Sequence, residues 1–175
     1  MIKRIVCPVD GSDHADKAVN LATDLAARYG AQLLLLHVYM RGMTHAQLEK
    51  FSGNSHLEDI LAEESKRVEE VFLAGGATID GVYVPPPTPE TIKRVAEVVL
   101  EDARQVAAKQ LGDAVTVATV DGSVAEEILN YAEAQGADMI VMGSRGLGDL
   151  RSMLLGSVSH QVNHLATCTC VKIGR

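Results

Sequence analysis

Residues 139–157 read MIVMGSRGLGDLRSMLLGS, and this stretch decides the fold. Met139–Met142 is a short apolar run of the kind found in strands buried on both faces of a parallel sheet. Glycines punctuate the loop from Gly143 to Gly156, and the residues from Ser157 to Ala166 have the pattern of a helix. We therefore expect a strand, a glycine-rich loop and a helix, an order that can present backbone N–H groups to an anion.

The same alternation of short apolar runs and helical stretches continues outward along the chain. Strands are predicted at Ile2–Val9, Gln32–Tyr39, Ala114–Val120 and Thr169–Ile173. This pattern favours an α/β fold, an open parallel sheet with helices on both faces. We expect one domain over residues 1–175, with an elaborated helical segment at about 41–112 between the second and third strands.

Local signals mark the ends of several helices. Ser12 is expected to cap a helix that runs to about Tyr29 and stops at Gly30. Ser123 and Glu126 have the spacing of a capping box. The charge-rich stretch Glu58–Glu70 is expected to be a solvated helix face, and Gly75-Gly76 to end that helix. After it, Ile79–Val84 is predicted as a short strand or an extended arm, and Pro85–Pro87 as extended backbone.

Composition limits the classes of partner. The chain has 175 residues and a net charge of −7, which disfavours binding to nucleic-acid phosphates. No apolar stretch approaches the roughly 20 residues that a membrane helix needs, and the N-terminus does not resemble a signal peptide. Three cysteines, an odd number in apolar runs, suggest buried thiols in a reduced, cytoplasmic protein. His37 is expected in the core or a pocket wall, and His160 with His164 on the surface.

Two segments carry the residues suited to binding a phosphate group. Gly143-Ser144-Arg145-Gly146 follows one strand, and Gly156-Ser157 opens the next helix. Glycine lets a phosphate approach the backbone, hydroxyls of Ser157 and Ser159 can donate, and Arg145 can offset charge. Asp10-Gly11-Ser12 follows the first strand and should reach the same edge of the sheet. From these residues alone, glycines in simple turns are an equally good interpretation.

The spacing resembles a family signature. Gly143-x-x-Gly146, nine residues and then Gly156-Ser157 match the G-2x-G-9x-G-(S/T) motif of ATP-binding universal stress proteins. Pro8–Ser12, His37-Val38 and Met139–Ser144 resemble that family's first, second and fourth strand motifs. The resemblance covers the whole chain and implies the adenine-nucleotide alpha-hydrolase-like fold, with a five-stranded parallel sheet in the order 3-2-1-4-5.

The same resemblance implies a ligand and its contacts: ATP, with AMP as an alternative, together with Mg²⁺. The adenosine half would lie against Pro8, Val9, Asp10, Val38, Met142 and Gly143. The phosphates would contact Gly146, Gly156, Ser157, Val158 and Ser159, beside Arg145. Asp10 would touch the ribose or a divalent ion that bridges the phosphates. We expect no dedicated metal ligands and no catalytic residues.

Three functions stay open at this point. The first is a nucleotide-dependent regulator or sensor in the stress response, a homodimer through its last strand with an unknown protein partner. The second is a slow ATPase, although no Walker lysine motif is present. The third is a nucleotide-free dimeric scaffold. The ending Cys168-Thr169-Cys170 departs from the family by lacking a proline, which bears on the expected dimer contact.

Overall fold

The computed structural model describes residues 1–39, 42–74, 77–78, 81–82, 84–147 and 156–174. The chain divides into two compact units, residues 1–40 with 99–175 and residues 41–98. A single domain over the whole chain stays a prediction. The elements are β1 (Arg4–Pro8), α1 (Asp13–Tyr29), β2 (Gln32–Tyr39), α2 (His45–Leu48), η1 (Glu49–Phe51), η2 (Ser55–Leu57), α3 (Glu58–Leu73), β3 (Ala77–Thr78), β4 (Gly81–Val82), α4 (Pro89–Leu111), η3 (Gly112–Ala114), β5 (Val115–Asp121), α5 (Val124–Ala134), β6 (Met139–Gly143), α6 (Ser157–Leu165) and β7 (Thr169–Ile173).

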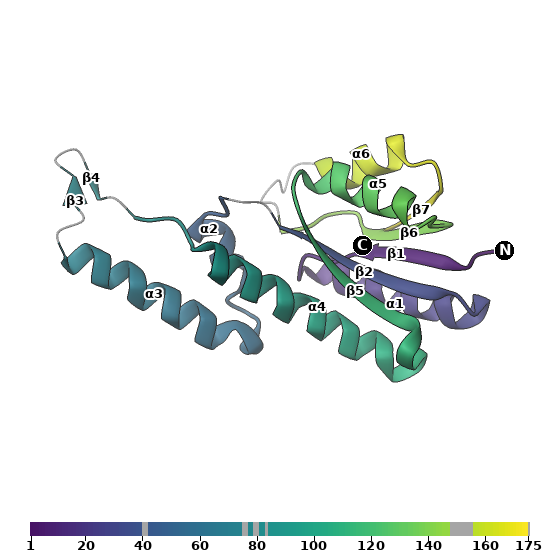
Figure 1. The fold of residues 1–175 in the computed structure, drawn as a ribbon, viewed down its shortest axis with the longest axis horizontal. Coiled ribbons are helices and arrows are strands. Elements are labelled where there is room, and N and C mark those ends of the chain that lie inside the picture. The colour runs from purple at the N-terminus through teal and green to yellow at the C-terminus, as the bar shows by residue number, and fades with distance from the viewer. Residues whose placement is uncertain (40–41, 75–76, 79–80, 83, 148–155, 175) are drawn as a thin grey trace. The chain divides into compact units, whose positions relative to one another are not determined.

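The first unit is built on a five-stranded parallel sheet in the order β5-β2-β1-β6-β7 (Figure 1). Numbered along the chain within this sheet, the order is 3-2-1-4-5, so the expected fold class and strand order are confirmed. β1 lies between β2 and β6, with Ile5 beside both Leu33 and Met139. The strand order reverses between β1 and β6, which is where open α/β sheets bind their ligands.

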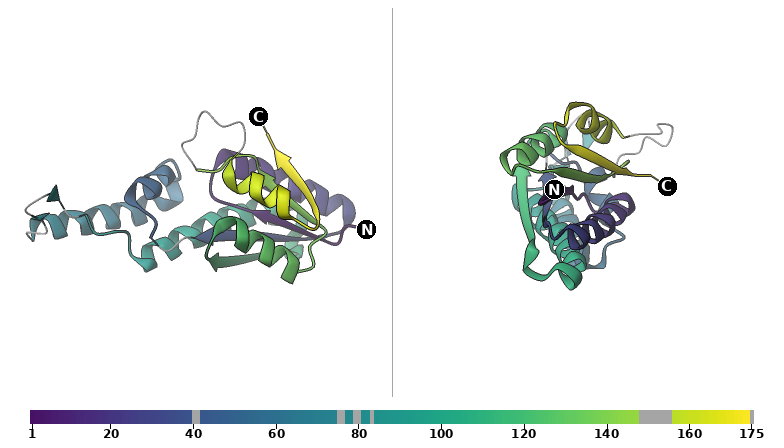
Figure 2. Two further views of the ribbon diagram at one scale, coloured as in Figure 1. Left: turned by 90° about the horizontal axis from the view of Figure 1, so that it is seen from above. Right: turned by 90° about the vertical axis from the view of Figure 1, so that its right-hand side faces the viewer.

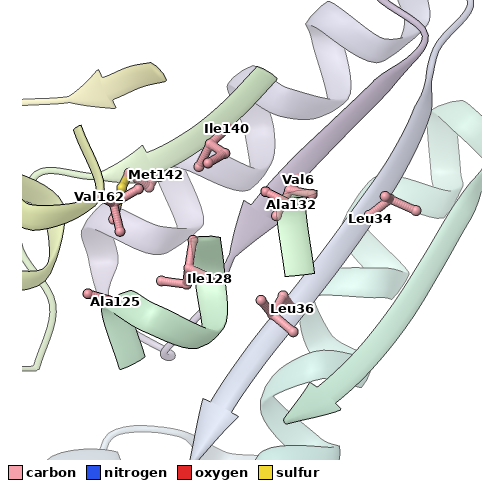
Figure 3. Packing of buried hydrophobic residues seen from close by; sticks show 9 residues of the cluster. All are labelled: Val6, Leu34, Leu36, Ala125, Ile128, Ala132, Ile140, Met142 and Val162. Carbon is pink, nitrogen blue, oxygen red and sulfur yellow. The ribbon is translucent and has the colours of Figure 1, made fainter. Parts of the chain in front are cut away.

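Both faces of the central strands are buried, which explains their unbroken apolar sequences. α1 covers one face, where Ile5, Cys7 and Val141 are fully buried, and α5 and α6 cover the other (Figure 2). Neighbouring residues of a strand point to opposite faces, so each strand supplies both layers. The layer under α5 and α6 is one cluster (Figure 3), made of Val6, Leu34, Leu36, Ala125, Ile128, Ala132, Ile140, Met142 and Val162.

Helix ends test the local predictions. Ser12 caps α1, because its hydroxyl accepts the N–H of Ala15 at 3.2 Å, and Gly30 ends the helix in the left-handed region at φ +63°. Both predictions are confirmed. The predicted capping box of Ser123 and Glu126 is wrong: Ser123 is the N-cap of α5, but its side chain makes no capping hydrogen bond. Both side chains are exposed, so water can replace the reciprocal bonds.

The second unit contains α2, α3, the start of α4 and a small hairpin. β3 and β4 pair antiparallel, so the segment predicted as one short strand or an arm at Ile79–Val84 contains the second strand of a hairpin. Ile79, Asp80 and Tyr83 lie outside the described residues, as do Gly75 and Gly76, which we expected to end α3. Residues 85–87 form no regular secondary structure, in agreement with their three prolines.

One carboxylate in α3 contradicts the expectation of a solvated helix face. The side chain of Glu64 is only 3% exposed. Its Oε1 accepts from Nη2 of Arg67 at 2.5 Å, and its Oε2 accepts from the Thr91 hydroxyl at 3.0 Å. Nε2 of His45 lies 3.9 Å from the same carboxylate, and Arg67 also donates to the Pro86 carbonyl. Burial of this charge is possible because paired donors replace water.

Candidate functional site

The carboxylate of Asp10 joins the ends of β1 and β6. Its Oδ1 accepts the N–H and the hydroxyl of Ser12, at 3.1 and 2.6 Å. Its Oδ2 accepts the N–H of Leu147 at 3.1 Å, so the loop after β6 is anchored to the segment that follows β1. Adjacent strands β1 and β6 bring these segments together, as the sequence predicts. Both carboxylate oxygens therefore hold protein groups in place.

Two glycines of the predicted motif are required by the protein itself. A Cβ on Gly146 would collide with Oδ2 of Asp10, and the hydrogen bond to Leu147 depends on that close approach. A Cβ on Gly143 would lie 2.9 Å from both the Arg145 carbonyl oxygen and Cβ of His14. Neither glycine has a positive φ, so close packing and not backbone conformation is the reason for both.

The far end of the loop is closed by the Ser144 carbonyl. It accepts the N–H of Gly156 at 2.9 Å and the hydroxyl of Ser159 at 2.8 Å. Ser159 is 2% exposed, and its hydroxyl also approaches the Gly156 carbonyl at 3.0 Å. These bonds bring residues 144 and 156 together. Eight of the residues between them, 148–155, lie outside the described residues.

Two helices begin near this edge of the sheet, and their first turns differ in charge. α1 is capped by Ser12 and carries Asp13 and Asp16 in its first turn. Burial raises the pKa of the Asp16 carboxyl, and the charges of Asp13, Asp10 and Asp102 raise it further. α6 has Gly156 as its N-cap, no side-chain cap and no acidic residue in its first turn. An anion would therefore meet open N–H groups at α6 and like charge at α1.

His37 supports the chain just before Asp10. The imidazole is 4% exposed, and its Nδ1 lies 2.9 Å from the Val9 carbonyl oxygen. Burial lowers the pKa of His37 by more than the Val9 hydrogen bond and the Asp10 charge raise it. The ring is thus neutral near pH 7 and donates from Nδ1 to Val9. The expectation that His37 packs in the core or a pocket wall is confirmed.

His14 was missed by sequence reasoning. Its Nδ1 is buried and is the one buried side-chain N or O atom, within the ranges that the structure describes, that has no hydrogen-bond partner. The residue adjoins Gly143, because a Cβ on Gly143 would approach its Cβ. Buried polar atoms in native proteins nearly always have a hydrogen-bond partner. The unpaired Nδ1 of His14 is therefore an exception, and it lies on a residue that adjoins the candidate ligand site. No motif or periodicity of the sequence marks this residue.

The other predicted contacts lie around the same edge with different exposure. Val9 and Met142 are buried, and the Met142 side chain belongs to the core cluster under α5 and α6. Val38 and Val158 are partly buried and pack against that cluster. Further predicted contact residues are half-buried, namely Pro8, Asp10, Gly143, Arg145 and Gly156. Gly146 and Ser157 are exposed.

The described residues contain neither a metal cluster nor a helix that could span a membrane. Among the described residues, no group of three or more His, Cys, Asp or Glu side chains could hold a metal ion. The described part of the chain likewise has no helix long and apolar enough to cross a membrane. Cys7 is buried, whereas Cys168 and Cys170 are only half-buried, so the expectation of buried thiols fails for these two. They lie at the start of β7 and just before it, on an edge strand with less cover.

Several known proteins are similar to this chain in sequence or in structure. A profile of the universal stress protein family matches residues 1–173. Universal stress protein YxiE of Bacillus subtilis is 32% identical over 168 residues, and the match covers 96% of each chain. The structure of universal stress protein UspA from Lactobacillus plantarum is 22% identical with a TM-score of 0.67, covering 98% of this chain and 97% of that one. A crystal structure of a universal stress protein in complex with cAMP is 18% identical with a TM-score of 0.62, covering 99% and 97%. The chain belongs to the universal stress protein family.

Proposed function

We propose that this protein binds ATP at the carboxyl ends of β1 and β6 and acts as a nucleotide-dependent regulator in the stress response. The observation that carries the proposal is the pairing of two features. Asp10 holds the start of the glycine loop through Leu147, and the loop ends at the uncapped, acid-free first turn of α6. A phosphate group placed there meets backbone N–H donors and the positive end of the helix dipole.

The phosphates would lie along the loop and the first turn of α6. Backbone N–H groups at Gly146, Ser157, Val158 and Ser159 are the proposed donors. Gly156, whose N–H is donated to the Ser144 carbonyl, would contact the phosphates through its Cα atom. Ser157 is exposed, so its hydroxyl can reach a ligand, whereas the Ser159 hydroxyl is already bonded to Ser144. Arg145, half-buried in the loop, would offset phosphate charge.

The adenosine half would lie across the ends of β2, β1 and β6. Pro8, Val9 and Asp10 supply one wall, Val38 a second and Met142 with Gly143 a third. Met142 would act through its backbone, because its side chain is 5% exposed within the core cluster. The relative solved with cAMP carries an adenine nucleotide, which supports this class of ligand, and AMP shares the same adenosine half.

The described residues favour a regulatory role over ATP hydrolysis. A general base must be able to reach a water molecule or hydroxyl group, but both Asp10 oxygens accept hydrogen bonds from the protein. Since no cluster of metal ligands occurs in the described ranges, Mg²⁺ would arrive on the nucleotide phosphates. Slow ATP hydrolysis would then come from the bound metal and solvent, without a dedicated base.

A homodimer through β7 is part of the proposal. β7 is one edge of the sheet, and its outer backbone groups can pair with the same strand of a second chain. The protein partner that senses nucleotide occupancy is unknown. Cys7, Cys168 and Cys170 form no disulfide, in keeping with work in the reducing cytoplasm.

A thermal-shift series tests the proposed function. A ligand at 100 times its dissociation constant stabilises the fold by about 2.7 kcal/mol, which should raise Tm by roughly 5–11 °C in a chain of this size. ATP, ADP, AMP and cAMP would be compared with and without Mg²⁺, with GTP as a control for the base. A shift with the adenine nucleotides alone supports the proposal. No shift with any of them would leave the dimeric scaffold as the better function.

A further inference from the structure

The strand β5 forms the edge of the sheet opposite β7. It pairs with β2 on one side, and no strand of the described residues lies on its other side (Figure 1). Edge strands of monomeric proteins usually carry a proline, a bulge or a charged side chain that prevents pairing. Residues 115–120 of β5, VTVATV, contain no charge and no proline, and their ladder to β2 runs without a bulge.

The direction of the free backbone groups follows from the ladder to β2. The N–H of Gly122 is donated to the Tyr39 carbonyl, and Tyr39 is the partner of Asp121 in the register. In a parallel ladder, alternate residues direct both their N–H and C=O to the same neighbour. The even-numbered residues of β5 therefore face β2, and Val115, Val117 and Thr119 direct N–H and C=O outward.

Val117 is an exposed apolar residue in the middle of this edge. Its side chain is 45% exposed. Ala118 and Val120 point to the opposite face, where they pack against the core cluster under α5. Val117 thus adds an uncovered apolar side chain to a row of unpaired backbone groups. The two properties coincide at one residue.

We propose that β5 pairs antiparallel with β5 of a second copy of this chain, about a two-fold axis at Val117. Such an axis is perpendicular to the sheet and keeps each face on its own side. Val117 then lies opposite its own copy, and Val115 lies opposite Thr119. All three are outward-facing residues, so each opposed pair can exchange both N–H···O bonds.

The paired segment of a second copy brings no charged side chain to this edge. The chain carries a net charge of −7, so two copies repel wherever acidic surfaces meet. The segment 115–120 brings no like charges together, and the two Val117 side chains cover each other. In this register Asp121 lies opposite Asp113 of the second copy, two positions outside the Val115–Thr119 pairs, where the two carboxylates repel. The contact uses the edge opposite β7 and does not rest on nucleotide binding.

Molar mass in solution tests the proposal. Light scattering after size exclusion would be measured over a concentration series for wild type, Val117→Lys and Val117→Thr. Lysine places like charges directly opposite each other, so the limiting mass should fall to half that of wild type. Threonine keeps an uncharged β-branched side chain and should preserve the wild-type mass. Equal masses for wild type and Val117→Lys at every concentration would overturn the proposal.

Cross-linking tests the register independently. A hydrogen-bonded antiparallel pair has its Cα atoms about 5.5 Å apart, within the range of a disulfide. Under mild oxidation, Val117→Cys should form a covalent dimer, whereas Thr119→Cys, which lies opposite Val115, should form several-fold less. Both variants carry the same native cysteines. Equal cross-linking of the two, or none, would contradict the two-fold axis at Val117.

Discussion

Oδ2 of Asp10 accepts the N–H of Leu147 at 3.1 Å, a hydrogen bond between residues 137 positions apart in the chain. The same oxygen occupies the space that a side chain at Gly146 would need. One carboxylate therefore determines where the glycine loop starts and why a glycine stands there. The motif glycine at 146 has a structural role in addition to any contact with a phosphate.

Replacing Gly146 by alanine should weaken the fold. The added Cβ would displace Asp10 or the loop, and we expect a loss of about 1–3 kcal/mol in the free energy of unfolding, the usual cost of overpacking. Gly53→Ala is the matched control, since no atom lies within 4 Å of the added Cβ and φ is not positive there. Urea unfolding of both variants provides the measurement. Equal stability of the two variants would show that the Asp10 contact is not needed.

The two serines of α6 should separate stability from ligand binding. Ser159→Ala removes the buried hydroxyl bonded to Ser144, so it should cost about 1 kcal/mol of stability. Ser157→Ala changes an exposed side chain and should leave stability unchanged while it weakens ATP binding. Thermal unfolding and ATP titration of each variant check this. If instead Ser159→Ala weakens ATP binding and Ser157→Ala lowers stability, the Ser159 hydroxyl is the phosphate ligand.

Glu64 should make the free energy of unfolding depend on pH in the acidic range. Burial alone would raise the pKa of its carboxyl, but hydrogen bonds from Arg67 and Thr91 and the charge of Arg67 hold the pKa below its usual value. Its contribution is therefore present above the unfolded pKa of about 4.3 and is lost as the pH falls through the lower folded value. Glu64→Gln should lower the free energy of unfolding by about 1–3 kcal/mol at pH 7.

The difference in free energy of unfolding between wild type and Glu64→Gln should shrink below about pH 4, because the wild-type carboxyl is then protonated. Urea unfolding at several pH values measures it, with Glu63→Gln as a control for a more exposed neighbour of the same chemistry. A difference that stays constant down to pH 3 would contradict the role of the charged carboxylate.

His37 should make the free energy of unfolding depend on pH just below neutrality. Burial depresses the pKa of the folded imidazole, so the unfolded chain takes up a proton first as the pH falls below about 6.5. Stability should decline from that point in wild type. His37→Asn keeps a donor for the Val9 carbonyl and removes the titration. If the stabilities of wild type and variant run parallel between pH 7.5 and 5, the neutral buried ring is not the cause.

The sequence predicts features that depend on neighbours along the chain. Gln32–Tyr39 and Thr169–Ile173 match their strands because apolar runs bounded by turn residues are local signals. The α1 cap at Ser12 and its stop at Gly30 were predictable for the same reason. The strand order required the family resemblance, because no pattern within one strand specifies its neighbour.

Features that depend on distant residues escaped prediction. Glu64 has the surroundings of a solvated helix face in sequence, and its burial follows from Thr91 and the proline segment 85–87. The unpaired Nδ1 belongs to His14, which adjoins Gly143, a residue 129 positions further along the chain. The motif after the first strand predicts a role for Asp10, but its bond to Leu147 appears only when β1 and β6 are adjacent.

Isothermal titration of ATP into the wild-type protein, freed of nucleotide by unfolding and refolding, tests the central claim most directly. We predict saturable binding of one ATP per chain, lost or weakened at least tenfold in Gly146→Ala and retained in Gly53→Ala. Absence of heat with ATP, AMP and cAMP at millimolar concentration, with the refolded protein still showing a cooperative unfolding transition, would contradict the proposal that this site holds an adenine nucleotide.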